Sequence, residues 1–210
     1  MQAITCMQTA PTSKSASERL LDAAMEVISR EGLSSATTRE IAKVAGVNEV
    51  TLFRNFQNKQ GLLAAVLQRA FLLTGEPKKG PRVEDGADLR EVVTHFAQAE
   101  FERKSKNIAL MRVLVGDIHR LGDHEAEVLK RIFQPVKEEL ANQFREAQRQ
   151  GMMRRSVDPA MIVDQLVAMI FIGALRADLP HWCVAYSTEE YLEGCVDTVV
   201  NGIAIRKEEP

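Results

Sequence analysis

The sequence predicts an all-α protein, in which a small three-helix domain precedes a larger helical domain. Apolar residues recur at the spacing of an α-helix along most of the 210 residues. A stretch rich in glycine and proline, Thr74 to Ala87, interrupts this pattern and indicates a loop. Gly46 marks a sharp turn between two short helices. The chain length suits one small module and one larger domain.

A first helix is expected from Ser17 to Glu31, because apolar residues recur there at helical spacing and Gly32 can end the helix. The residues before it, 1–16, show no such period. We therefore expect these first residues to form a flexible arm.

The next segment, Thr38 to Phe56, has the residue order of a helix-turn-helix. Ala42 lies where a second helix must pass close by, and Gly46 can adopt a positive φ at the turn. Leu52 then points back inside the unit. We expect the hydroxyl of Thr38 to cap the first short helix and Asn48 to cap the second.

A tight helical hairpin inside an all-α protein would satisfy the same pattern, with Gly46 serving only to end a helix. The sequence on either side favours a complete module. After Phe56, Asn58 can cap a fourth helix, whose apolar stripe continues from Leu62 to Phe71. Three short helices and a fourth leading away would form a compact N-terminal unit.

The run from Glu18 to Leu67 resembles the DNA-binding domain of the tetracycline-repressor-like (TetR-type) transcriptional regulators. The matching order is T-T-R-E-I-A-K-V-A-G-V-x-x-x-T-L-F-R-x-F-x-x-K-x-x-L-L. The resemblance implies an all-helical homodimer, in which a divergent C-terminal domain binds a small molecule and sets the separation of two DNA-reading heads. The expected limits are 1–16 for the arm, 17–63 for the helix-turn-helix DNA-binding domain and 64–210 for the ligand-binding and dimerisation domain.

This resemblance implies a ligand-responsive DNA-binding transcriptional regulator, and we expect a repressor that a small molecule releases from a palindromic operator on double-stranded DNA. The alternative is a helical small-molecule binding or carrier protein whose N-terminal hairpin is structural. Effector, operator and target genes cannot be taken from the sequence.

The DNA contacts are expected on the outward face of the second short helix and at the helix starts around it. Glu49 could accept a hydrogen bond from a cytosine amino group, and Val50 could touch a thymine methyl group. Several positions depart from the family's usual reading helix, and Phe53 lacks the phenol that could reach a phosphate. Structural alternatives remain, such as Arg54 in an ion pair or Lys59 as a solvated lysine. The candidates are Thr38, Arg39, Asn48, Glu49, Val50, Thr51, Phe53, Arg54, Asn55 and Lys59.

The charge distribution agrees weakly with this assignment. The chain has 27 basic and 29 acidic residues. Up to Thr74 there are 8 basic and 6 acidic residues, which leaves 19 basic and 23 acidic residues in the remainder. The N-terminal part is thus the positive one, as a DNA-binding domain would be.

The remainder of the chain is expected to be helical throughout. Apolar periodicity predicts helices around Leu89–Ala97, Ile108–Ile118 and Val128–Phe144, and Pro135 should kink the last of these. Two further helices are expected at Asp158–Asp178 and Thr188–Ile205.

The last two helices are expected to form the homodimer interface. The first of them is apolar almost all round, which is more than one side of a monomer requires. Gly173 and Ala174 would allow a close approach of the partner helix. The alternative is the central core helix of a monomer.

The effector pocket is expected among apolar residues of the second domain, although the same spacing also fits plain core. The candidates are Phe96, Phe101, Met111, Leu114, Phe133 and Met169.

No catalytic constellation and no cofactor motif is found, so the chain is not expected to be an enzyme. Asp117, His119, Asp123 and His124 form the only His/Asp cluster, but their spacing matches no common metal site and a solvated helix end explains them.

The cellular location is expected to be the cytoplasm. Three cysteines without Cys-x-x-Cys spacing, at 6, 183 and 195, indicate a reducing compartment. A signal peptide is not evident, and the uncharged apolar stretch Leu166–Leu175 is too short to span a bilayer. A membrane partner is therefore not expected.

Overall fold

A computed structural model of the chain describes residues 14–72, 80–117, 119, 122–179 and 185–205. Cys6, His181, Trp182 and Cys183 lie outside these ranges. The described residues are helical, and their β-structure is limited to an isolated bridge between Met153 and Ala204. The all-α prediction is confirmed. The elements are α1 Ala16–Glu31, α2 Thr38–Val44, α3 Glu49–Phe56, α4 Lys59–Leu72, η1 Val83–Asp85, α5 Leu89–Lys106, α6 Ile108–Gly116, α7 Asp123–Arg149, α8 Pro159–Ala177 and α9 Thr188–Ile203.

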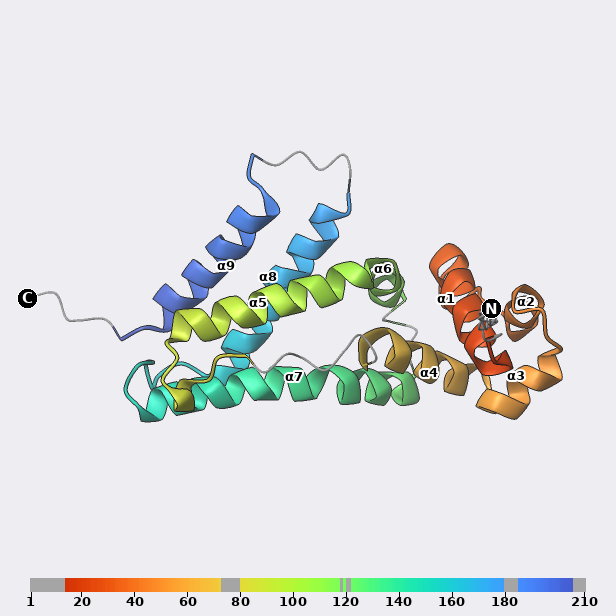
Figure 1. Cartoon of the computed structure of the whole chain (residues 1–210), viewed down its shortest axis with the longest axis horizontal. Helices are drawn as coiled ribbons and strands as arrows, with labels where there is room; N and C mark the ends of the chain where they lie inside the picture. Colours follow the sequence, from red (N-terminus) through yellow and green to blue (C-terminus); the bar gives the residue numbers. More distant parts are fainter. Residues whose placement is uncertain (1–13, 73–79, 118, 120–121, 180–184, 206–210) are drawn as a thin grey trace, which may run out of the picture.

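The molecule is elongated, with the first three helices at one end (Figure 1). α4 leads from this head into the body, and α7 runs along the length of the body beneath α5. α8 and α9 lie side by side and rise away from α7, at a distance from the head. The head and the α8–α9 pair are therefore separate surfaces of one chain.

α1 begins slightly earlier than expected, because Ser15 caps it. The Ser15 side chain accepts from the Glu18 N–H, and the Glu18 carboxylate accepts from the Ser15 N–H, which is a capping box. The predicted arm therefore ends before Ser15, and its first thirteen residues lie outside the described ranges.

The prediction that Thr38 caps α2 is wrong. Thr37 is the capping residue, since its hydroxyl accepts from the Glu40 N–H at 3.1 Å. The other turn predictions are confirmed. Gly46 has a φ of 65°, and the Asn48 side chain accepts from the Val50 N–H at 2.9 Å to cap α3.

The turn between α3 and α4 is unusually tight. Asn58 caps α4 as expected, because its side-chain oxygen accepts from the Gly61 N–H at 2.7 Å. A Cβ atom added at Gly61 would lie 2.1 Å from the carbonyl oxygen of Phe56. Only glycine therefore allows α4 to start so close to the end of α3.

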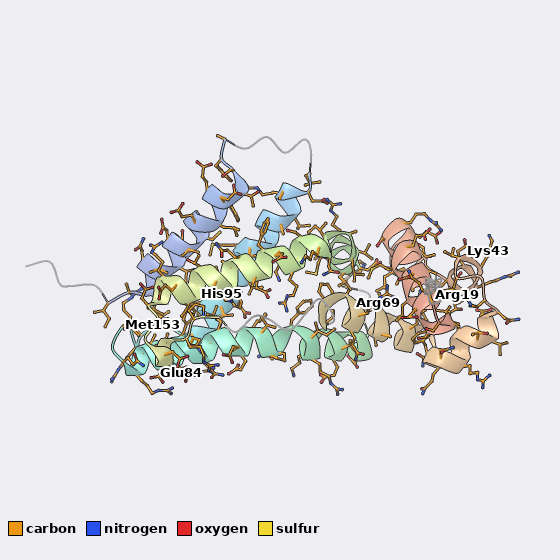
Figure 2. All side chains as sticks on the ribbon, in the orientation of Figure 1. Arg19, Lys43, Arg69, Glu84, His95 and Met153 are labelled. Carbon is orange, nitrogen blue, oxygen red and sulfur yellow. The ribbon has the colours of Figure 1, made fainter. Side chains whose placement is uncertain are left out.

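α4 joins the head to the body without a break in packing. The hydrophobic cluster of the head includes Leu110 and Leu114 from α6 and Ile132 from α7. Arg69 of α4 (Figure 2) also forms an ion pair with Asp22, which links α4 to α1 of the head. The expected limit at residue 63 falls inside α4, so the division into 17–63 and 64–210 remains a prediction.

The body differs from the prediction in element length. α7 starts at Asp123, earlier than expected, and continues past Pro135 to Arg149 without interruption. α5 extends to Lys106, beyond the apolar pattern that predicted it. A short 3₁₀ turn, η1, lies within the predicted loop, where the Val83 N–H donates to the buried Gln143 side chain at 2.9 Å.

Gly173 and Ala174 do not provide the close approach to a partner helix that was expected. Both are buried within the chain, and a Cβ at Gly173 would lie 2.5 Å from the Tyr191 ring of α9. The Tyr191 hydroxyl donates to the Met169 carbonyl at 2.9 Å. The small residues on this face of α8 thus serve the packing of α9 in the same chain.

α8 is longer than the uncharged stretch Leu166–Leu175 and contains it. Its 19 residues have a mean hydropathy of 1.7, which by length and composition is enough to cross a membrane. Only 28% of the apolar window is buried inside the chain. Much of this helix is therefore apolar surface that the chain itself does not cover.

Candidate DNA-binding surface

The outward face of α3 combines apolar and polar side chains. Leu52 is fully buried and anchors the helix to the head, whereas Val50 is 71% and Phe53 is 44% exposed. Single exposed apolar side chains are common on protein surfaces, so the place of these two in the fold is what matters. Their position on the second helix of a helix-turn-helix is the one that enters a DNA major groove.

Several of the predicted reading residues are held by contacts within the head. The Thr38 hydroxyl donates to Glu49 Oε1 at 2.6 Å and so links the start of α2 to the start of α3. The Asn55 amide donates to the Thr51 carbonyl at 2.7 Å. Asn48 is used as the cap of α3. These side chains are oriented before any DNA arrives.

Arg39 and Arg54 are exposed cations on α2 and α3, and neither has a carboxylate partner among the described residues. Lys43, by contrast, lies 3.6 Å from Glu40. Figure 2 places Lys43 and Arg19 on the head as well. Arg39 belongs to α2, and Arg54 belongs to α3 itself.

Lys59 is bound inside the head instead of being a fully solvated lysine. Its Nζ donates to the Leu33 carbonyl at 2.8 Å, and the Ser34 carbonyl lies 3.5 Å away. Burial lowers the pKa of the Lys59 ammonium below its usual range, and the Asp117 charge opposes this effect. A contact from Lys59 to a phosphate remains a prediction, with part of its donor capacity already used.

Thr37, which was not among the candidates expected from the sequence, caps α2 beside them. Thr37 is exposed and directly precedes α2, where backbone N–H groups at the helix start can bind a phosphate. The sequence does contain a signal for it, since Thr37 and Glu40 have the S/T-x-x-E spacing of a helix start.

Replacing Thr37 by alanine is expected to destabilise the protein by about 1 kcal/mol, because the α2 N-terminus loses its side-chain acceptor. Urea unfolding followed by circular dichroism would measure the change. Thr37→Ser keeps the hydroxyl and should retain most of the stability. Equal losses in the serine and alanine variants would contradict the capping role.

Asp117, at the end of α6, connects the body to the head. Its Oδ2 accepts from the Leu33 N–H at 2.9 Å and lies 3.4 Å from the Ser34 N. These atoms belong to the turn between α1 and α2.

The described residues contain no group of three or more His, Cys, Asp and Glu side chains that could hold a metal ion, and the side chain of His124 lies outside them.

The six predicted pocket residues fall into two separate hydrophobic clusters. Met111, Leu114 and Phe133 pack with the cluster of the head, α4 and α6, whereas Phe96, Phe101 and Met169 pack with the cluster of α5, α8 and α9. A common pocket formed by these six residues therefore remains a prediction. A hollow of about 490 Å³ lies elsewhere, at the α3–α4 turn and the start of α7, where Gln57, Gly61 and Asp123 are among its lining residues.

Comparisons with known proteins agree with this architecture. A family model described as bacterial regulatory proteins, tetR family, matches residues 20–66, and a tetracyclin repressor-like C-terminal domain matches residues 86–199. The solved structure of a TetR family transcriptional regulator from Pseudomonas syringae pv. tomato superimposes with a TM-score of 0.69 at 20% identity, covering 93% of this chain and all of that one.

Two curated relatives support the same family. The uncharacterized HTH-type regulator YvkB of Bacillus subtilis is 51% identical over 59 residues, which is 28% of this chain and 29% of YvkB. The nicotine-responsive repressor HdnoR of Paenarthrobacter nicotinovorans is 28% identical over 153 residues, covering 70% of this chain and 77% of HdnoR. The chain belongs to the tetR family of bacterial regulatory proteins and is a DNA-binding transcriptional regulator.

Proposed function

We propose that the chain is a cytoplasmic repressor that binds a palindromic operator as a homodimer and is released by a small molecule. The observation that carries this proposal is the exposed face of α3, with Val50 and Phe53 outward and two unpaired arginines beside it. On DNA these groups would meet base edges and phosphates, which is the role of the second helix of a helix-turn-helix. HdnoR, a relative by sequence, is a nicotine-responsive repressor and provides the precedent for a response to a small molecule.

The contacts to DNA divide into two kinds. Arg39, Arg54, Thr51 and the α2 N-terminus at Thr37 would bind phosphates and set the position of the head. Val50 and Phe53 would lie against base edges, where Val50 suits a thymine methyl group. Glu49 would read a cytosine amino group with the carboxylate oxygen that Thr38 leaves unused. Sequence preference would therefore come mainly from the start of α3.

We propose that α8 and α9 form the dimer interface. On α8, four residues at helical spacing are exposed on one face: Met161, Gln165, Ala168 and Ile172, with Met161 57% and Ile172 47% exposed. On α9, Gly194 and Gly202 leave open space where a Cβ would stand. A second copy of the same pair would cover this apolar surface in a four-helix bundle.

The effector would act by selecting among dimer shapes. Two heads on a palindrome must reach successive major grooves about 34–36 Å apart. α4 packs on both α1 and α7, so a change in the body reaches the head through this helix. A ligand that favours another head separation would weaken operator binding in proportion to its preference for that state.

Selection of duplexes from a random pool, followed by fluorescence anisotropy, tests the proposal. A palindromic consensus bound far more tightly than random DNA is expected. Salt-sensitive binding without any preference would overturn the proposal and leave a non-specific carrier.

Arg54→Ala is expected to weaken binding to all duplexes and to reduce the slope of log K against log salt by about 1, because one phosphate contact is lost. Arg155→Ala provides a matched control, since Arg155 is an exposed arginine between the end of α7 and the start of α8, at the end of the body far from the head (Figure 1). An unchanged slope in Arg54→Ala would remove this residue from the interface.

A further inference from the structure

A charged cluster is buried in the body, between α5 and α7. Glu100 and Lys104 on α5 are only 4% and 3% exposed. Lys104 Nζ donates to Glu100 Oε2 at 3.0 Å, and Arg103 donates to the other oxygen of the same carboxylate. Lys104 also lies 5.8 Å from the centre of the Phe133 ring on α7.

This cluster has more positive than negative charge. The charged groups that act on Lys104 are one carboxylate, Glu100, and two cations, Arg103 and Lys137. Lys137 is itself paired with Asp164 of α8 at 2.7 Å. That pair is partly exposed and neutral, so the buried cluster itself has two cations, Arg103 and Lys104, against the Glu100 carboxylate, a net charge of +1. Burial lowers the pKa of the Lys104 ammonium below its usual range, and the neighbouring Glu100 opposes that shift.

The donors of the cluster also outnumber its acceptors. Arg103 Nε is buried and has no acceptor among the described residues. Lys104 has three N–H donors, of which the described residues engage one. Buried cations are costly to keep in a protein unless acceptors surround them, and one shared carboxylate is a weak compensation. The cluster therefore suits one additional anionic group.

The surroundings connect this site to the DNA-binding head. The Phe133 ring, beside Lys104, meets the Phe71 ring of α4 at 5.1 Å in an edge-to-face contact. The other end of α4, at Lys59, directly follows the turn after the reading helix α3. A group that draws Lys104 away from Phe133 would alter the packing of α4. Pro135, two residues beyond Phe133, removes a backbone hydrogen bond from α7 at this point.

We propose that this cluster is the effector site and that the effector is an organic acid, whose carboxylate binds Arg103 and Lys104 while its apolar body lies against Phe133. The inference rests on the proposed regulation by a small molecule and specifies its chemical class. Glu100 competes with the acid for the same two cations and holds them in place when the acid is absent.

The opposite effects of two substitutions test the site. Calorimetry at pH 7.5 would compare phenylacetate, 2-naphthoate and decanoate with their primary amides, on the full-length protein. We expect acids to bind at least about tenfold more tightly than the amides. Lys104→Met and Arg103→Gln should each lose about tenfold or more, whereas Glu100→Gln should bind acids more tightly than the wild type.

Lys106→Met is the matched control, because Lys106 lies on the same helix but is exposed and paired with Glu102 at 2.6 Å. Its acid binding should equal that of the wild type. Acids bound no better than amides, or an undiminished affinity in both Lys104→Met and Arg103→Gln, would overturn the site. Operator binding without any acid is measured separately, so a failed effector site and a failed DNA-binding function give different results.

Discussion

Replacing Ile172 by glutamate is expected to convert the dimer into a monomer and to abolish tight operator binding. Ile172 is 47% exposed on the face of α8 that we assign to the dimer. A carboxylate there would meet its own copy near the symmetry axis and would be buried without a partner. A single head cannot use both half-sites, so operator affinity should fall by about 10³-fold or more. Sedimentation at micromolar concentration and anisotropy on the selected duplex measure the two effects.

Val115 provides the matched control for this substitution. It is 48% exposed, nearly the same fraction as Ile172, but it lies on α6. Val115→Glu should remain dimeric and bind the operator as the wild type does. If Ile172→Glu remains dimeric, the interface lies on another surface, and α8 serves as a core helix within each chain.

Replacing Gly61 by alanine is expected to destabilise the head and to displace the reading helix. The added Cβ would lie 2.1 Å from the Phe56 carbonyl oxygen, which is backbone and cannot rotate away. Overpacking of this kind costs about 2 kcal/mol, and the gain of about 1 kcal/mol in helix propensity offsets only part of it. Because the strain is relieved by opening the α3–α4 turn, operator affinity should fall as well.

Gly116→Ala is the control for this substitution, since Gly116 also lies in a helix but has no atom within 4 Å of an added Cβ. It should be as stable as the wild type or slightly more so. Urea unfolding of the two variants gives the comparison. Equal stability of Gly61→Ala and Gly116→Ala, with unchanged DNA binding, would show that the turn adapts without cost.

The helices of the head could be predicted closely because their signals are local. Asn48 and Asn58 cap the helices that follow them, and Gly46 adopts the positive φ that its turn requires. The error at Thr38 amounts to one residue in a pair of threonines, either of which can cap a helix. Spacing and capping depend on neighbours within one turn, which the sequence displays directly.

The charged half of α5 could not be recognised in the same way. Its buried positions include Glu100 and Lys104, so the apolar period that marks a helix disappears where the helix continues. The six apolar residues expected to share a pocket are another case. Their spacing identified buried and partly buried positions but could not show that these positions divide between two clusters.

The sequence by itself determined the helix-turn-helix, the cap of its second helix and the all-helical body, because each depends on contacts between residues close in the chain. Only the tertiary structure decided which distant groups meet. It placed Gly173 against Tyr191, Asp117 against the turn after α1, and Lys104 against Phe133. These partners are far apart in sequence, and their pairing follows from how whole helices pack, which no local pattern specifies.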